Sequence, residues 1–473
     1  MAINNVLNTD LLPEVQEFLN KETHGALIGG EEVMASDGGT FDTHDPGSGE
    51  KLATVANLTE EDVERAVASA QRAFDESDWA RMPAAERCAH LLRLADEVEK
   101  RKAIIAQIES LDCGKIYEQA IADVENFIET HRYFANLAQN LELRTVIDVK
   151  EHEAAVIRHP WGPCGFIIPW NFPFLLCGWG IAPATAAGNT CVVKPAEDTP
   201  LSTLYVAHLA KEIGYPDGVI NVIPGIGEQT GAALSENPNL KRMSFTGSPE
   251  VGRIVASNCG RNLIPVKLEL GGKGAAVIFD DVDINDAAEK LVGAITFHTG
   301  QVCCDATRWL IQKDIYDDFI SAATDRLKAV NIGHQMDEGT QMGPVVSEIQ
   351  CKRVLGYLEK GVVEGAVLPR PECTIAEKDG EVHEGEESEA DQHGKAGKAA
   401  TGSRFILGQG RHDLLEKIIE EGRPALDPHG NQADPEENGQ PHPSYGGRLR
   451  DETRGRVAAP GHQRRDQEKG EAL

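Results

Sequence analysis

The fold class of this chain is decided at Cys164-Gly165-Phe166-Ile167-Ile168-Pro169-Trp170-Asn171-Phe172-Pro173. The first five of these residues form a short apolar run, which is typical of a strand buried in a parallel sheet. Two similar runs follow, Thr190-Cys191-Val192-Val193 and Val219-Ile220-Asn221-Val222-Ile223, and residues 201–213 between them have helical periodicity. Strands that alternate with helices build βαβ units. Residues 163–265 therefore predict a doubly wound α/β domain.

The regions on either side of this domain have patterns of their own. Thr59-Glu60-Glu61-Asp62 predicts a capped helix start, and residues 59–140 are rich in helical patterns. Residues 145–162 alternate in the manner of a β-hairpin, and a second α/β region is expected from about residue 265. Beyond residue 366 the apolar periodicity is lost, and the polar composition of residues 367–473 predicts a largely disordered tail.

Composition excludes several classes of partner. The 473 residues allow two or three domains, and the net charge of −30 argues against a nucleic acid or an anionic membrane as partner. We expect no membrane span and no targeting peptide, because no run of about 18 apolar residues is present. The ten cysteines lack metal-ligand spacing, so we expect no metal site and a reducing cytoplasm.

Three segments carry residues suited to covalent catalysis. Cys303, in Phe297-His298-Thr299-Gly300-Gln301-Val302-Cys303-Cys304, is the candidate nucleophile. Glu269, which is followed by two glycines, is the candidate general base, and the amide of Asn171 is the candidate oxyanion donor. Taken singly, a cysteine pair is more often a small buried element, and a glutamate before two glycines is more often a solvated turn residue. Together the three are the parts needed for chemistry on a carbonyl.

These segments resemble the NAD(P)-dependent aldehyde dehydrogenase superfamily over residues 20–366, and the middle region is similar to betaine-aldehyde and broad-specificity members. The resemblance implies two Rossmann-like α/β domains and a β-hairpin oligomerisation arm. Its parts would be an NAD-binding domain (1–144 and 163–265), the association arm (145–162) and an incomplete catalytic domain (266–366). Residues 367–473 lack the late motifs of the family, so the tail is interpreted as divergent or as read in a shifted frame.

The same resemblance implies oxidation of a small aldehyde to a carboxylic acid, through a thiohemiacetal and a thioester on Cys303. Asn171 and the Cys303 N–H would hold the oxyanion, and Glu269 would activate the water that hydrolyses the thioester. Phe172 and Trp179 would line the passage for the aldehyde. A homodimer or homotetramer is the expected assembly, if the C-terminal region permits it.

NAD is the implied cofactor. The segment Thr246-Gly247-Ser248 opens a helix whose N-terminus can face a pyrophosphate. Glu197 would accept hydrogen bonds from the adenosine ribose and repel a 2′-phosphate, which favours NAD over NADP. The implied cofactor residues are Ile168, Trp170, Lys194, Glu197, Gly227, Gly231, Phe245, Thr246, Gly247, Ser248, Val251, Leu270 and Gly271.

Two alternatives stay open. A coenzyme A-acylating aldehyde dehydrogenase would use a thiol in place of water in the last step, and a glutamate placed to activate water counts against it. An inactive remnant, disrupted in its C-terminal part, would keep the motifs and lose turnover.

Overall fold

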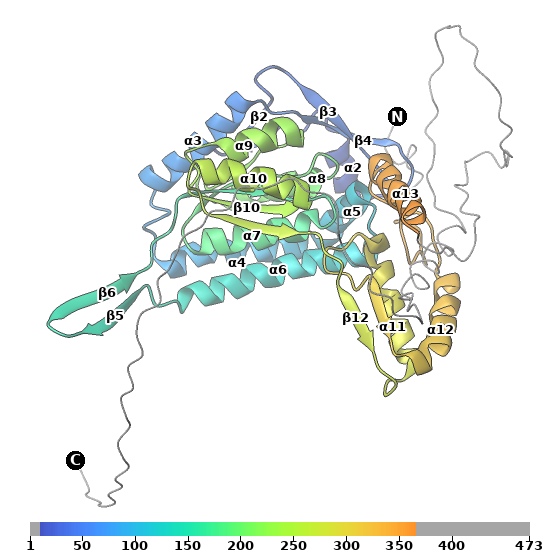
Figure 1. Cartoon of the computed structure of the whole chain (residues 1–473). Coiled ribbons are helices and arrows are strands. Elements are labelled where there is room, and N and C mark those ends of the chain that lie inside the picture. The colour runs from blue at the N-terminus through green and yellow to red at the C-terminus, as the bar shows by residue number, and fades with distance from the viewer. Residues whose placement is uncertain (1–9, 366–473) are drawn as a thin grey trace, which may run out of the picture. The chain divides into compact units, whose positions relative to one another are not determined.

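A mostly parallel seven-stranded sheet organises residues 10–365, the part of the chain that the computed structural model describes (Figure 1). Its parallel strands are β7 (Pro163–Ile167), β8 (Thr190–Lys194), β9 (Ile220–Val222), β10 (Arg242–Gly247) and β11 (Val266–Leu270). Two antiparallel strands, β1 (Ala26–Ile28) and β2 (Glu31–Val33), extend one edge. The order across the sheet is β11-β10-β7-β8-β9-β1-β2. The predicted α/β class is confirmed.

The chain enters this sheet in the middle and winds in both directions. From β7 it passes through α7 (Pro173–Ala186) to β8, and through α8 (Leu201–Glu212) to β9. It returns by η1 (Gly227–Gly231) and α9 (Ala232–Glu236) to β10, on the other side of β7, and then by α10 (Pro249–Arg261) to β11. The direction of winding therefore reverses between β7 and β10. Ligands of open α/β sheets bind at such a switch point, outside the carboxyl ends of the strands.

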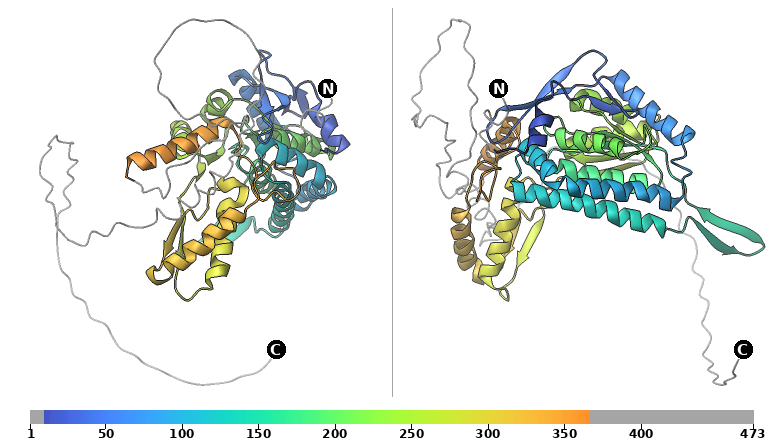
Figure 2. Two further views of the ribbon diagram at one scale, coloured as in Figure 1. Left: turned by 90° about the vertical axis from the view of Figure 1, so that its right-hand side faces the viewer. Right: turned by 180° about the vertical axis from the view of Figure 1, so that it is seen from behind.

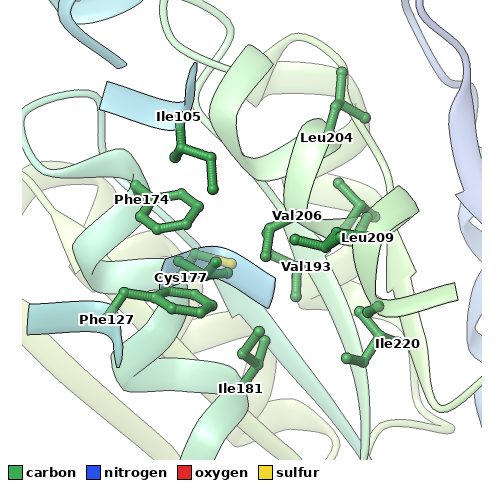
Figure 3. Close-up of a cluster of buried hydrophobic side chains, with 14 of the residues drawn as sticks. Ile105, Phe127, Phe174, Cys177, Ile181, Val193, Leu204, Val206, Leu209 and Ile220 are labelled. Atoms are coloured by element: carbon green, nitrogen blue, oxygen red, sulfur yellow. The ribbon is translucent and has the colours of Figure 1, made fainter. Parts of the chain in front are cut away.

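Helices cover both faces of the sheet, and this explains why the central strands are apolar throughout. Val193 of β8 belongs to one buried cluster and its neighbour Val192 to another, because successive side chains point to opposite faces. Figure 3 shows the cluster that β8 and β9 share with α7 and α8, where Phe174 lies close to Phe127. A Cβ at Gly178 would lie 2.6 Å from the Phe127 ring, so this glycine permits the close approach of α7.

The N-terminal region is helical, as its sequence predicts. It contains α2 (Pro13–Leu19), β3 (Thr40–His44), β4 (Lys51–Ala56), α3 (Glu60–Glu76), α4 (Ala84–Lys100), α5 (Lys102–Cys113) and α6 (Tyr117–Gln139). The predicted start of α3 is confirmed, because Thr59 and Asp62 form a reciprocal capping box. Asp62 is fully buried and its carboxylate also accepts hydrogen bonds from the backbone and hydroxyl of Ser36.

We expect an Asp62→Asn substitution to destabilise the protein by about 1–3 kcal/mol, because buried donors would lose a charged acceptor. Burial raises the pKa of Asp62, but the hydrogen bonds from Ser36 and Thr59 outweigh it and the pKa lies below its usual value. The stabilisation is therefore present above about pH 4 and lost as the pH falls through the folded-state pKa. Melting temperatures of both proteins at neutral and acidic pH would check this, and equal values at neutral pH would contradict it.

A second, smaller α/β unit follows β11 (Figure 2). It pairs β12 (Ala275–Ile278) with β13 (Arg308–Ile311) in parallel and contains α11 (Ile284–Thr296), η2 (Phe297–Gly300), η3 (Lys313–Ile315), α12 (Tyr316–Ala329) and α13 (Glu348–Val363). Its core includes Trp309 and Phe319. β11 is the edge strand of the first sheet, and β12 is the first strand of this smaller unit.

The predicted hairpin consists of β5 (Arg144–Val149) and β6 (His152–Ile157) and extends away from α4 and α6 (Figures 1 and 2). It exposes apolar side chains, among them Val146 and Ile157. The predicted disorder of residues 367–473 lies outside the described residues. None of the helices within residues 10–365 is long and apolar enough to cross a membrane.

Candidate active site

The candidate nucleophile follows a sharp turn at the end of α11. His298 and Thr299 have φ angles of 43° and 62°, which are left-handed values that non-glycine residues rarely adopt, and Gly300 continues the turn with φ 71°. Two contacts hold this backbone: the His298 N–H donates to Gln119 Oε1 at 3.0 Å, and Thr299 Oγ1 donates to the Gly343 carbonyl at 2.9 Å. The turn presents Cys303 as an exposed thiol.

The amide of Asn171 lies against the same loop. Its Nδ2 donates to the carbonyl oxygen of Gln301 at 2.8 Å. A carboxamide carries two N–H donors, and this bond uses one of them, so the second can serve an oxyanion. The side chain of Gln301 is also fixed, because it donates to the His298 carbonyl and accepts from the backbone N–H of Val346. Asn171, four residues after the end of β7, is thus joined to the cysteine loop through a hydrogen bond from its side chain to the loop backbone.

Glu269 lies on β11, and the segment that follows this strand runs beside the cysteine loop. A Cβ at Gly272 would lie 3.4 Å from the carbonyl oxygen of Cys303, and one at Gly274 would lie 3.0 Å from that of Asp305, whereas a Cβ at Gly271 would have no atom within 4 Å. The Glu269 carboxylate is exposed and forms an ion pair with Lys267 at 3.2 Å. Close packing against the cysteine loop therefore explains the glycine at 274, and leaves the one at 271 without a packing reason.

The electrostatics of Cys303 favour the protonated thiol. Burial raises its pKa, and Cys304 and the negative charge of Glu269 raise it further. The thiolate is the reactive form of a cysteine, so the thiol must lose its proton before it reacts.

A hollow of about 330 Å³ runs along α7, β7, β10 and β11 and reaches Glu269. Trp179, a predicted lining residue, forms part of its wall with Leu176 and Phe166, and donates from Nε1 to Asn126 at 2.8 Å. Phe172 is not part of this wall. Its ring packs instead against Phe297 and His298, where the cysteine loop begins.

Predicted cofactor residues meet at the carboxyl end of β8. The Lys194 ammonium, which is buried, contacts Glu197 at 2.8 Å, and the other carboxylate oxygen of Glu197 accepts from the Gly227 N–H at 3.3 Å. Gly231 lies close to the Lys194 side chain. Burial raises the pKa of Glu197, but the charge of Lys194 outweighs it and the pKa lies below its usual value. The carboxylate is therefore ionised and suited to ribose hydroxyls.

A second group of predicted cofactor residues surrounds the start of α10. Ser248 caps this helix by accepting from the Val251 N–H at 3.3 Å, so the helix N-terminus lies directly after β10. A Cβ at Gly247 would lie 2.6 Å from the Phe245 ring, so only glycine fits there. Thr246 borders the hollow.

The remaining predicted cofactor residues lie at the ends of the two strands on either side of β10, Ile168 and Trp170 after β7, and Leu270 and Gly271 at the end of β11. The N-terminus of α10 and the ionised carboxylate of Glu197 both follow the carboxyl ends of parallel strands, where dinucleotides bind in folds of this kind.

The sequence did not point to several residues of this site. Gln119 supports the strained turn from α6, and Lys115 with Asp123 lies behind Phe172. Gln119 and Asp123 lie in a helical stretch whose polar residues look like solvated positions. Gly114, which precedes Lys115, has a left-handed conformation and ends α5. A glycine at such a position indicates the end of a helix and gives no sign of a functional residue beside it.

The fold and this site define a doubly wound α/β protein of the dinucleotide-binding type, with an exposed cysteine on a loop that is hydrogen-bonded to Asn171. The chain belongs to the aldehyde dehydrogenase family, whose model matches residues 33–382. This confirms the resemblance seen in the sequence and, at the level of the family, the predicted class of NAD-dependent aldehyde dehydrogenases.

Individual relatives agree with this assignment. The mitochondrial benzaldehyde dehydrogenase of Antirrhinum majus is 42% identical over 344 residues, which are 72% of this chain and 64% of that protein. The chain thus spans less than two thirds of that relative. The human mitochondrial aldehyde dehydrogenase is 41% identical over 362 residues, 75% of this chain and 68% of that protein. The NAD+ complex of the Bacillus cereus aldehyde dehydrogenase has a TM-score of 0.73 at 38% identity, over 76% of this chain and 73% of that one.

Proposed function

We propose that this protein oxidises a small aldehyde to the carboxylic acid with NAD. One observation carries the proposal: Asn171 is hydrogen-bonded to the loop that carries Cys303, and the charge of Glu269 acts on the Cys303 thiol, on the side of the sheet where two groups of residues suit a dinucleotide. The family supports the general reaction. We assign the NAD-binding domain to residues 1–144 and 163–265, and the catalytic domain to residues 266–366.

In the proposed cycle, the Cys303 thiol releases its proton to solvent and the sulfur adds to the aldehyde carbon. The free N–H of the Asn171 amide and the backbone N–H of Cys303 donate to the oxygen that becomes negative. NAD, when bound, supplies the acceptor for the hydride that leaves this carbon. Glu269 then takes a proton from water, the hydroxide adds to the Cys303 thioester, and the acid leaves as the thiol reforms.

The position of Glu269 supports water as the final acceptor, because its exposed carboxylate lines a hollow large enough for water. Dependence of turnover on added coenzyme A would instead support the acylating alternative. The exposed apolar hairpin supports the further proposal of a homodimer or homotetramer. The exposed thiols of Cys303 and Cys304 are compatible with the proposed cytoplasmic location.

The preference for NAD over NADP depends on Glu197 in this proposal. We expect Glu197→Ser to raise the ratio of kcat/KM for NADP to that for NAD by about tenfold or more, because a like-charge repulsion of about 1–2 kcal/mol is removed. Steady-state kinetics with each cofactor would measure the ratio. Glu228→Ser, which removes a nearby exposed carboxylate, should leave it unchanged. Equal turnover of the unaltered protein with both cofactors would contradict the preference.

The direct test measures NADH absorbance with the purified 473-residue protein, NAD and a panel of aldehydes that includes acetaldehyde, benzaldehyde and betaine aldehyde. Steady NADH formation that requires aldehyde is the expected result. If a folded protein with a cooperative melting transition binds NAD and forms no NADH with any aldehyde, the proposal fails. The inactive-remnant alternative would then hold.

A further inference from the structure

A fully buried lysine, Lys115, lies behind the loop that carries Asn171 and the loop that leads to Cys303. Lys115 follows Gly114, the left-handed residue that ends α5, and forms an ion pair with Asp123 of α6. Its backbone is held as well, because Ser110 Oγ donates to the Lys115 carbonyl at 2.6 Å. A Cβ at Gly114 would lie 3.0 Å from the ring of Pro344, so the segment has little room to shift.

The ammonium of Lys115 points at an aromatic ring of the site. Its Nζ lies 3.9 Å from the centroid of the Phe172 ring, a cation–π contact that gains strength because water is excluded. Phe172 is the residue after Asn171 and directly precedes α7. The next turn of that helix is anchored in the core through Phe174 (Figure 3). The cation therefore acts on the one aromatic ring that lies between the oxyanion donor and the fixed helix.

The Phe172 ring also meets the cysteine loop. It stacks on Phe297 with centroids 6.3 Å apart and an interplanar angle of 13°, and contacts His298 edge-on at 5.5 Å. His298 is the first residue of the strained turn that leads to Cys303. A single ring thus touches both the Asn171 loop and the start of the cysteine loop.

The charge of Lys115 is maintained by its surroundings. Burial lowers the pKa of this lysine, but the negative charge of Asp123 outweighs it and the pKa lies above its usual value. Glu109, also fully buried, and Cys113 face the same ammonium. Burial and then the charge of Lys115 hold the pKa of His298 well below its usual value, so His298 is neutral beside the ring. A buried ion pair adds little to stability compared with apolar residues of the same volume, which points to a role other than stability.

We propose that Lys115 is a positioning residue for the reaction: held by Asp123, its ammonium fixes the Phe172 ring, and the ring sets the place of the Cys303 loop relative to the Asn171 amide. The inference rests on the proposed function. Phe172 is, in this arrangement, a spacer between two catalytic loops as well as a candidate contact for the aldehyde.

The test uses the full chain and removes both charges together, because Lys115→Met alone would leave Asp123 buried without its partner. For the pair Lys115→Met with Asp123→Leu we expect a melting temperature close to that of the unaltered protein. We expect kcat to fall about tenfold or more while KM for NAD changes less than twofold. A purely structural role would lower the melting temperature and change both kinetic constants together.

A second readout does not depend on turnover. In the charge-free pair, which is the double variant Lys115→Met with Asp123→Leu, hydrogen exchange of the backbone amides of residues 297–303 should become about tenfold faster. The amides of α3, which is far from Phe172 in the sequence, should keep their exchange rates. Phe172→Leu should cause the same two changes, and combining it with the charge-free pair should add little, because all three substitutions break one chain of contacts.

Four outcomes test the positioning role of Lys115 and separate it from the proposed function. Unchanged kcat and unchanged hydrogen exchange in a folded charge-free pair would overturn the inference. It would also be overturned if the fall in kcat in the triple variant equalled the product of the falls caused by the charge-free pair and by Phe172→Leu. If the charge-free pair does not fold, Phe172→Leu alone decides, and normal kcat and exchange in that variant would overturn the inference. A protein that is inactive without any substitution refutes the proposed function, and the exchange measurement then still tests whether Lys115 orders the cysteine loop.

Discussion

Replacing Cys303 with alanine should lower aldehyde-dependent NADH formation by a factor of about 10⁴ or more, because the covalent route to the acid requires a nucleophile at this position. The loop that carries Cys303 makes its hydrogen bonds through the backbone and through Thr299 and Gln301. The substitution should therefore leave folding and NAD binding intact. Turnover is read from NADH absorbance, and binding from the rise in melting temperature with added NAD.

Cys304 provides the matched control, because it is the adjacent exposed thiol. Cys304→Ala removes a neighbour that raises the pKa of the Cys303 thiol, so turnover should be retained or modestly increased. Loss of activity in Cys304→Ala with activity preserved in Cys303→Ala would show that the roles of the two cysteines are reversed.

Glu269→Gln should separate the two halves of the reaction. We expect steady turnover to fall about 10²–10⁴-fold, the usual contribution of a positioned general base, because water is no longer activated for attack on the thioester. The first half should survive, since Glu269 contributes to the raised pKa of the Cys303 thiol and its loss makes a thiolate easier to form. A rapid burst of about one NADH per active site, followed by slow release, is therefore the expected time course.

Glu289→Gln, an exposed carboxylate on α11, is the control and should behave like the unaltered protein. Absence of a burst in Glu269→Gln, in protein that still binds NAD, would assign Glu269 to thiol activation instead of hydrolysis. Restoration of its turnover by coenzyme A would show that a thiol can take the place of water in the last step.

The local elements could be predicted because their causes are local. The runs at β7, β8 and β9 are apolar on both faces, which a strand between two helical layers requires. The capping box depends on Thr59 and Asp62, which are three positions apart, and the hairpin of β5 and β6 depends on alternating residue types along each strand. The edge position of β11 could not be predicted in this way. Its alternating exposure shows that one of its faces packs on the core and the other is exposed, and such a pattern carries no information on which sheet a strand joins.

The candidate site also combines local features, which the sequence predicts, with long-range contacts, which it does not. Cys303, Glu269, Asn171 and the two groups of candidate cofactor residues were identified from short motifs. The contacts that place them join segments far apart in the chain, such as Asn171 with Gln301 and Lys115 with Phe172. Phe172 shows the difference most clearly. Its motif suggested a passage for the aldehyde, whereas its ring lies between a buried cation and the cysteine loop.

By itself, the sequence determined the family, the α/β class and the chemical groups available for catalysis, because each is encoded in residue types at short spacing. Only the tertiary structure decided which of these groups meet, since a switch point exists only when β10 returns to the far side of β7. It also decided that the lysine at the end of α5 is buried with Asp123 instead of solvated. Burial and long-range proximity arise from packing of the whole sheet and its helices, and no short stretch of sequence contains them.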